Sequence, residues 1–210
     1  MENNLQRTEE WFEMRLGRLT ASTISKLTGI KGLGLTGESL AFEKAVEIVF
    51  GRDPEWNVET WDMRRGTEQE EKAFDLFQRL NAIRFEVQKA EFFPLGENSG
   101  ASPDGLAGKD AVLEIKCPRP EKFFKIVKDG IEAIDKEWLD QMQHEMRCTN
   151  SVKCYFFIYL QWKGKELHHT IEIPFDKERS DFILERIEKA VVIRDNFVQE
   201  LRDNIQFKWS

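Results

Sequence analysis

The stretch SPDGLAGKDAVLEIKCP, residues 102–118, decides the fold. Its second half alternates like a β-strand, so Glu114 and Lys116 leave one face of a sheet while Leu113 and Ile115 leave the other. The residues before them are apolar as well, which is typical of a central strand. The stretch therefore predicts a strand over 111–116 that carries an acid and a lysine side by side.

Charges on a central strand need a reason, because burying an unpaired ion costs several kcal/mol. Asp104 stands in a tight Pro-Asp-Gly segment about ten residues upstream, and a turn with a return strand would bring it beside Glu114. Two carboxylates and Lys116 can then hold a hard cation such as Mg²⁺ or Mn²⁺ and orient a water molecule. The alternative is a plain turn at Asp104 and an exposed strand-edge ion pair.

Composition limits the classes of protein that fit. The chain has 210 residues, 40% hydrophobic and 33% charged, with a net charge of −7, which predicts a folded core and argues against a surface that grips nucleic acid everywhere. A local basic channel stays open. Three cysteines and three histidines without paired motifs argue against a disulfide framework and a structural zinc site. No apolar run is long enough to span a membrane, and we expect a cytoplasmic protein.

Periodicity predicts one α/β domain over 1–210 with a mixed sheet. We expect it to comprise a mainly helical part over 1–80, the catalytic sheet and its helices over 81–175, and a C-terminal helix over 176–210. The first expected helix begins at Thr8. The other expected helices cover 20–27, 39–50, 67–80, 120–128, 135–147 and 176–201. The expected strands cover 83–88, 90–93, 100–106, 111–116, 152–162 and 167–173.

Several motifs in one order make the sequence resemble the lambda exonuclease (YqaJ-type viral recombinase) family of the PD-(D/E)XK nuclease superfamily. The two most specific are the SPDGL and LEIKCP segments of residues 102–118. The others are RLGRLTAS at 15–22, a G-x-x-x-E-x-x-A helix motif at Gly66, Glu70 and Ala73, and a Q-x-Q-x-x-M helix motif at Gln141, Gln143 and Met146. The motifs extend over roughly residues 8 to 160, and none of them includes the C-terminal helix.

The resemblance implies a restriction-endonuclease-like core, a central mixed β-sheet flanked by helices, and a role for each motif residue. Asp104, Glu114 and the backbone carbonyl of Ile115 would bind Mg²⁺, for which Mn²⁺ can substitute, with two ions expected. Lys116 would contact the attacking water. The remaining implied roles are the second metal for Glu70, site orientation for Gln141, and a pocket for the DNA 5′-phosphate for Arg15 and Ser22.

Without the resemblance, these last residues have ordinary readings. Glu70 belongs to a charged helical segment and would be assigned to the surface. Periodicity does not decide whether Gln141 points to the site or to solvent. Arg15 can pair with Glu9 or Glu10 on the first helix.

A row of basic residues precedes and follows the start of the predicted helix at 120–128. Arg119, Lys122 and Lys125 recur every three residues, so the row drifts around the helix and forms a diffuse basic side. These residues are candidates for contacts to the DNA backbone.

The implied function is a Mg²⁺-dependent 5′–3′ exonuclease that degrades one strand of linear double-stranded DNA and leaves 3′ single-stranded tails. The family implies a homotrimeric ring around DNA and a single-strand annealing protein as partner in phage-type recombination, in a bacterial host. Two alternatives remain, a restriction or junction-resolving endonuclease and a DNA-binding assembly module without catalysis. An iron–sulfur exonuclease would need four cysteine ligands and is disfavoured by three.

Overall fold

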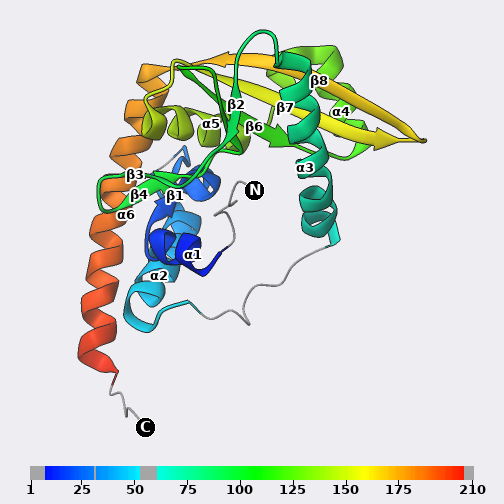
Figure 1. The fold of residues 1–210 in the computed structure, drawn as a ribbon. Coiled ribbons are helices and arrows are strands. Elements are labelled where there is room, and N and C mark those ends of the chain that lie inside the picture. The colour runs from blue at the N-terminus through cyan, green and yellow to red at the C-terminus, as the bar shows by residue number, and fades with distance from the viewer. Residues whose placement is uncertain (1–7, 31, 53–60, 206–210) are drawn as a thin grey trace.

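A computed structural model describes residues 8–30, 32–52 and 61–205 and shows a mixed α/β architecture (Figure 1). Its helices are α1 Glu9–Arg15, the 3₁₀ helix η1 Ala21–Leu27, α2 Gly34–Phe50, α3 Trp61–Asn81, α4 Pro120–Asp129, the 3₁₀ helix η3 Gly130–Ala133, α5 Lys136–Thr149 and α6 Lys177–Asn204. Its strands are β1 Leu19–Thr20, β2 Val87–Lys89, β3 Phe93–Leu95, β4 Ser99–Ala101, β5 Gly105–Ala107, β6 Ala111–Lys116, β7 Lys153–Trp162 and β8 Lys165–Pro174.

The larger sheet has the strand order β2-β5-β6-β7-β8 and is mixed, as predicted. β6 runs parallel to β7, and the other neighbours are antiparallel. One face packs on α3, where Leu113 and Phe157 meet Phe77. The other face packs on α4 and α5, where Val112 and Phe156 join their apolar residues. The strand expected over 111–116 is β6, and it lies between two neighbouring strands.

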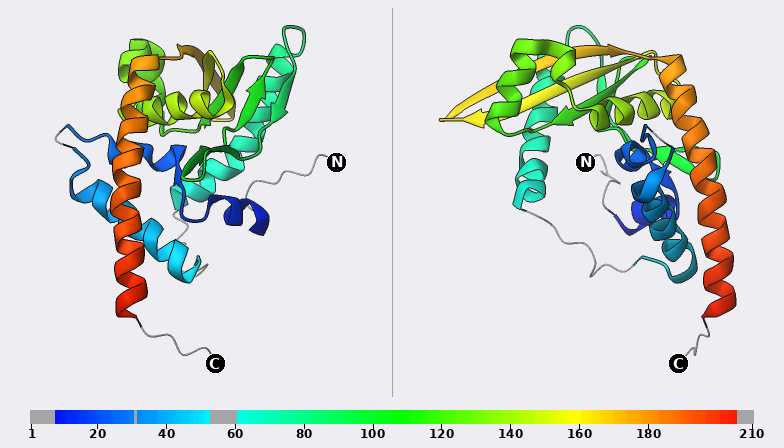
Figure 2. Two further views of the ribbon diagram at one scale, coloured as in Figure 1. Left: turned by 90° about the vertical axis from the view of Figure 1, so that its left-hand side faces the viewer. Right: turned by 180° about the vertical axis from the view of Figure 1, so that it is seen from behind.

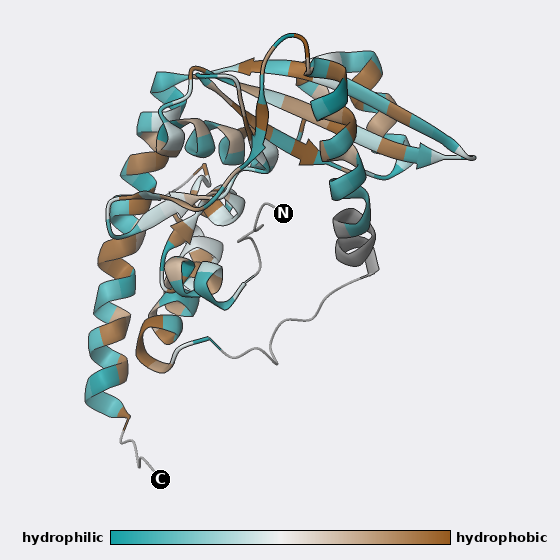
Figure 3. Cartoon of the chain, viewed as in Figure 1, coloured by the Kyte–Doolittle hydropathy of each residue, from teal (hydrophilic) through white to brown (hydrophobic). Residues whose placement is uncertain are grey.

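The β7–β8 hairpin is the longest strand pair and turns at Lys163 and Gly164, which have φ values of 49° and 75°. Two successive positive φ values are typical of the tight turns that match the twist of a hairpin. Figure 3 shows the pair changing from brown segments near the centre of the sheet to a hydrophilic tip. The hairpin was predicted from its apolar runs around Lys163-Gly164-Lys165.

The helices η1 and α2 pack with α6 around a second apolar core, separate from the two faces of the larger sheet. The side chain of Thr8 accepts a hydrogen bond from the Trp11 N–H and caps α1, as its position predicted. η1 and α2 pack on α6 through a cluster that includes Ile24, Leu40 and Ile183. Figures 1 and 2 show α2 lying alongside α6, which continues well past the sheet.

A smaller sheet, β1-β4-β3, links the larger sheet and the second core. The single strand expected over 100–106 is in fact two strands, because residues 102–104 leave the ladder between β4 in the small sheet and β5 in the large one. The strand expected over 90–93 forms instead at 93–95 as β3. This break is what places the Pro-Asp-Gly segment at the junction of the two sheets.

Three other boundaries differ from the sequence expectation. α2 begins at Gly34 and α3 at Trp61, five and six residues before the predicted starts. The strand expected over 83–88 starts only at Val87. The carbonyl oxygen of Asn81 accepts hydrogen bonds from the N–H groups of residues 84 and 85, so the chain turns after α3 and leaves Ile83 fully exposed. The apparent alternation there reflects a turn.

The described part of the chain contains neither a helix that could span a membrane nor a disulfide. None of its helices is long and apolar enough to cross a membrane. Cys117, Cys148 and Cys154 carry free thiols.

Candidate active site

A cavity of about 240 Å³ lies where α1, η1, α3, α5 and the β5–β6 strands meet. Its lining contains the eight residues predicted for metal binding, catalysis or the 5′-phosphate: Arg15, Ser22, Glu70, Asp104, Glu114, Ile115, Lys116 and Gln141. Four further residues complete the lining: Trp11, Ala21, Ser102 and Glu145.

Asp104 reaches the site through the turn between β4 and β5. β5 returns antiparallel to β6 with Gly105 opposite Leu113, so the preceding residue lies beside Glu114. The Asp104 Oδ2 atom accepts a hydrogen bond of 2.6 Å from the Ile115 N–H. A side chain at position 105 would place its Cβ 2.9 Å from the carbonyl oxygen of Gln88, so the close approach of these strands requires glycine.

Glu114, Lys116 and Gln141 form a connected triad on the α5 face of the sheet. The Lys116 Nζ lies 2.5 Å from the Glu114 Oε1 and 3.2 Å from the Gln141 Oε1. The Gln141 Nε2 donates to the same Glu114 oxygen at 2.7 Å. Gln141 therefore points into the site, which periodicity did not decide, and Glu114 is only 2% exposed.

The acidic groups repel one another, and this controls their protonation. Burial raises the pKa of Asp104 well above its ordinary value, and the charges of Glu114 and Glu70 raise it further. Burial alone would lower the pKa of Lys116, but Glu114 and Asp104 outweigh it and raise that pKa. Lys116 thus stays protonated, a cationic hydrogen-bond donor with no lone pair for a general base.

Glu70 lines the cavity from α3 and is half-buried, so its side chain is not simply part of a solvated face. Its negative charge acts on Asp104 across the cavity. Glu70 therefore lies at the rim of the acidic cluster and not on a solvent-exposed helical face.

Glu145 is an acid of the cavity that our sequence reasoning missed. It lies one helical turn after Gln141, has 0% exposed surface, and its Oε1 accepts a hydrogen bond of 2.8 Å from the Gln141 Nε2. Its Oε2 is buried with no hydrogen-bond partner. Burial and the charge of Glu114 raise the pKa of Glu145. The i to i+4 spacing from Gln141 was the one signal that pointed to it.

Arg15 forms the cationic end of the cavity. Its Nη1 donates to the Ser102 Oγ at 3.0 Å and its Nη2 to the Thr20 Oγ1 at 3.2 Å. The guanidinium lies 4.1 Å from the centroid of the Trp11 ring. These partners differ from the acids of α1 that sequence spacing offered. Burial lowers the pKa of Arg15 to about 10, which keeps it charged at neutral pH.

Trp11 and Ser102 are two further lining residues that were not predicted for the site. The Trp11 Nε1 donates to the Ser102 Oγ at 3.0 Å, so one hydroxyl accepts from both the indole and Arg15. Trp11 stands one turn before Arg15 on α1, and Ser102 precedes Asp104 by two residues. Ser102 belongs to the SPDGL motif, whereas Trp11 belongs to none of the motifs and only the structure brings it to the cavity.

The basic residues near α4 do not line the cavity. Lys122 forms an ion pair with Asp135, Lys125 is exposed, and Arg119 is exposed at the residue before the helix. Their place on the outside of α4 leaves contacts to DNA backbone as a proposal.

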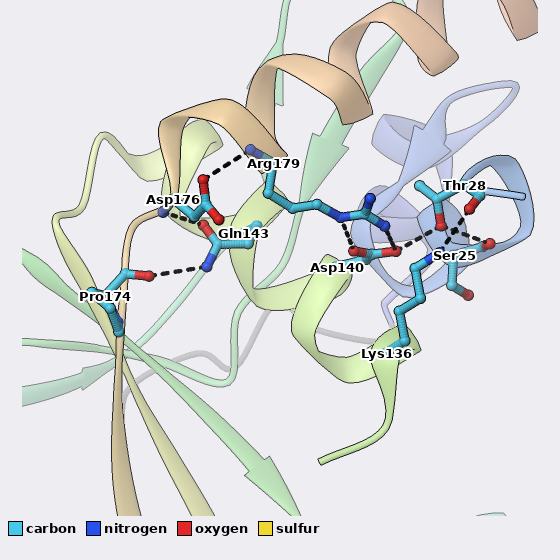
Figure 4. A network of polar contacts seen from close by, with 8 residues as sticks. All are labelled: Ser25, Thr28, Lys136, Asp140, Gln143, Pro174, Asp176 and Arg179. Carbon is cyan, nitrogen blue, oxygen red and sulfur yellow. Dashed lines mark hydrogen bonds and ion pairs between the residues drawn. The ribbon is translucent and has the colours of Figure 1, made fainter. Parts of the chain in front are cut away.

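A separate polar network anchors α5 to its neighbours (Figure 4). Asp140 accepts from the Arg179 Nε and Nη2, both at 2.7 Å, and from the Thr28 hydroxyl at 2.6 Å. Lys136 donates to the Thr28 carbonyl oxygen at 2.8 Å. The network joins η1, α5 and α6, and it fixes the helix that presents Gln141 to the cavity.

The donor set of the cavity suits a hard divalent cation. Its carboxylates supply only oxygen donors, and one of their oxygens is buried without a partner. Across residues 8–30, 32–52 and 61–205, no three Asp, Glu, His or Cys side chains are grouped so as to hold an ion by themselves. Mg²⁺ keeps several waters and uses one or two carboxylates, so two acids with a carbonyl and water meet its needs.

Comparison with known proteins gives one family match and several similar solved structures. Residues 10–151 match the YqaJ-like viral recombinase domain, and no curated protein sequence matches the chain. The structure is similar to that of an alkaline exonuclease from Laribacter hongkongensis, with a TM-score of 0.78 and 26% identity over 93% of this chain and 97% of the other. A complex of that exonuclease with dAMP gives a TM-score of 0.79 at the same identity and coverage.

A phage related exonuclease from Haemophilus somnus 129PT shares the fold at 18% identity, with a TM-score of 0.65 over 88% of this chain and 96% of the other. The restriction-endonuclease-like fold expected from the sequence is thus confirmed by the similarity to the alkaline exonuclease structures. The match over residues 10–151 covers most of the chain. The chain therefore belongs to the YqaJ-like viral recombinase domain family.

Proposed function

We propose that the protein is a Mg²⁺-dependent exonuclease that degrades one strand of linear double-stranded DNA from its 5′ end. The observation that carries the proposal is the single cavity that joins buried acids and Lys116 to the cationic end at Arg15. Such a cavity offers sites for a divalent cation and for a terminal phosphate within one space. The similarity to a named exonuclease supports the nuclease activity.

The acids of the cavity would hold the metal. Asp104, Glu114 and the backbone carbonyl of Ile115 are the proposed ligands of one ion, and Glu70, which lines the cavity from α3, is the proposed ligand of a second. When bound, such ions lower the pKa of a water molecule and neutralise charge on the phosphate. The fold holds these carboxylates close together although their negative charges repel one another. A bound cation would offset that repulsion.

Lys116 and Gln141 would position the reacting groups. Because Lys116 is held protonated by its acidic neighbours, it donates a hydrogen bond to the attacking water or to a phosphate oxygen and stabilises negative charge there. Gln141 forms hydrogen bonds with both Lys116 and Glu114 and so fixes the position of the ammonium group relative to the carboxylate. Neither residue has to accept a proton for the water to attack in line.

The 5′ direction rests on the cationic end of the cavity. A planar guanidinium matches the oxygens of a phosphate, and Ser22 and Ser102 add hydroxyl donors beside Arg15. A terminal phosphate held there would place the next phosphodiester toward the acids. The similar exonuclease was crystallised with dAMP, and a deoxynucleoside monophosphate is what removal of one nucleotide from either end releases, so that complex supports exonuclease activity and leaves the direction to Arg15.

The remaining parts of the proposal extend from the family. They comprise a homotrimeric ring around the DNA, release of 3′ single-stranded tails to a single-strand annealing protein, and action in the cytoplasm of a bacterial host. Arg119, Lys122 and Lys125 on the outer side of α4 are proposed to contact the DNA backbone.

Digestion of end-labelled linear duplexes, with 5′-phosphate or 5′-hydroxyl ends and with or without Mg²⁺, tests the proposal. We expect Mg²⁺-dependent release of label from the 5′-phosphorylated strand, and no digestion of a closed circular plasmid. Extensive cutting of closed circles would establish the endonuclease alternative instead. Intact DNA in both Mg²⁺ and Mn²⁺, despite measurable DNA binding, would establish the assembly module.

A further inference from the structure

Five residues contain a buried polar side-chain atom without a hydrogen-bond partner in the described part of the chain, and one of them lines the acidic cavity. They are Gln69, His144, Glu145, Ser180 and Arg186. Only Glu145 belongs to the cavity lining. A buried carboxylate oxygen without a donor is unfavourable, because it loses hydration and gains nothing in return. At the lining of an acidic cavity, such an atom is a candidate to bind a cation or its water.

No hydrogen-bond donor of the described residues reaches the second carboxylate oxygen of Glu145. Gln141 has two amide hydrogens, and its Nε2 lies 2.7 Å from the Glu114 Oε1 and 2.8 Å from the Glu145 Oε1. Lys116 is bound to Glu114 and to the Gln141 carbonyl oxygen. Glu145 forms no ion pair with any residue of the described ranges, and the positive charge of Lys116 acts on it only at longer range.

The position of Glu145 extends the acidic cluster. It faces the cavity from α5, whereas Asp104 reaches it from the turn before β5, Glu114 from β6 and Glu70 from α3. Acids from separate parts of the fold therefore line one cavity whose cations are Lys116 and Arg15. A divalent cation would balance this excess and would give the free oxygen of Glu145 a partner.

We propose that Glu145 is a further acid of the cation site, and that its unpartnered Oε2 binds a divalent ion or a water of its hydration shell. The inference rests on the proposed metal-dependent function. Gln141 acts as the positioning residue, because its amide holds the other oxygen of Glu145 and turns the carboxylate toward the cavity.

Binding of Mn²⁺ to the DNA-free protein, measured by electron paramagnetic resonance, tests the assignment separately from activity. Glu145→Gln preserves the shape of the side chain and removes its charge, and Glu137→Gln on the exposed side of α5 is the matched control. We expect Glu145→Gln to weaken Mn²⁺ binding about tenfold. This is the smaller of the affinity losses seen when a residue that hydrogen-bonds to a metal ligand is replaced. Glu137→Gln should bind as the wild type does.

Thermal unfolding with EDTA and with Mn²⁺ separates this role from a structural one. We expect the melting temperature of Glu145→Gln in EDTA to equal or exceed that of the wild type, and its rise with Mn²⁺ to be smaller. Wild-type Mn²⁺ affinity in Glu145→Gln, or a lower melting temperature in EDTA with an unchanged rise, would overturn the inference. If Glu145→Gln does not fold, Glu145→Leu takes its place in both measurements under the same criteria.

Asp104→Asn distinguishes failure of this inference from failure of the proposed function. If Asp104→Asn loses Mn²⁺ binding and Glu145→Gln keeps it, the proposed metal site stands and the assignment of Glu145 to that site is wrong. Unchanged binding in both variants would overturn the metal site and the inference together.

Discussion

Asp140 and Gln141 are neighbours on α5, yet they belong to polar networks of opposite character. Asp140 is 1% exposed, and both of its oxygens are paired, with Arg179 and Thr28 (Figure 4). Gln141 joins two buried acids, of which Glu145 keeps an unpartnered oxygen. The first network is complete without any ligand, and the second is not.

The difference separates polar groups that hold the fold from polar groups that wait for a ligand. A fully paired buried network specifies how elements pack, whereas a buried cluster with unpaired acids lowers stability and is kept for function. Adjacent residues on one helix can serve both purposes because their side chains point about 100° apart around the axis. Four predictions test this contrast.

The largest effect is expected at the incomplete network. We expect Asp104→Asn to reduce Mg²⁺-dependent digestion at least about a hundredfold, because it removes a proposed metal ligand. The same change should leave the protein as stable as the wild type or more stable at pH 8. The folded-state pKa of Asp104 is raised, so its ionised form opposes folding above its ordinary pKa, and the amide avoids this.

Urea unfolding at pH 8 and pH 4 checks the stability of this variant against the wild type. The advantage of Asp104→Asn should shrink toward pH 4, where Asp104 of the wild type is protonated. A strong loss of stability at pH 8 would place Asp104 with the structural residues.

The complete network should respond in the opposite way. We expect Asp140→Asn to lower the free energy of unfolding by about 3 kcal/mol, because it leaves the Arg179 guanidinium without its bidentate partner. Digestion by the folded variant should stay within about threefold of the wild type, since Asp140 does not line the cavity. Glu137→Gln, on the exposed face of the same helix, is the control for charge removal. Stability equal to that of Glu137→Gln would contradict the structural role.

His144 offers an intermediate case, buried and unpaired but outside the cavity lining. Burial and the charge of Arg147 lower its pKa to about 4. Because the unfolded chain binds a proton at His144 near pH 6.5 and the folded chain does not, His144 should contribute a loss of about 3 kcal/mol of stability as the pH falls from 6.5 to 4. His144→Leu should lose less over this range.

Urea unfolding at pH 7.5 and pH 4.5 measures this difference, with His168→Gln at an exposed position as control. Parallel losses in wild type and His144→Leu would show that folding does not lower the pKa of His144.

The smallest effect is expected at the cationic end of the cavity. We expect Arg15→Ala to reduce the preference for 5′-phosphate over 5′-hydroxyl ends about tenfold, the value of one charge-assisted hydrogen bond. Competition between the two substrates in one digestion measures this ratio. Lys125→Ala, outside the cavity, should keep the preference of the wild type. Equal loss on both ends in Arg15→Ala would assign Arg15 to packing.

Much of the fold could be predicted because local patterns were strong. The alternation in 111–116, the apolar runs around Lys163-Gly164 and the cap at Thr8 each depend on neighbours in the sequence, and each is confirmed. The expected strand at 83–88 failed because alternation also occurs in a turn, where the carbonyl oxygen of Asn81 captures the following N–H groups. Local patterns do not report such competing hydrogen bonds.

The sequence by itself determined that Asp104, Glu114 and Lys116 would meet, since one turn and one strand pairing suffice to join them. Only the tertiary structure decided which side chains of the helices complete the cavity. Arg15 meets Ser102 across 87 residues, and Glu145 reaches the acids only because α5 packs on the Glu114 face of the sheet. Periodicity shows which residues share a face, but contacts between distant elements depend on how those faces pack against one another.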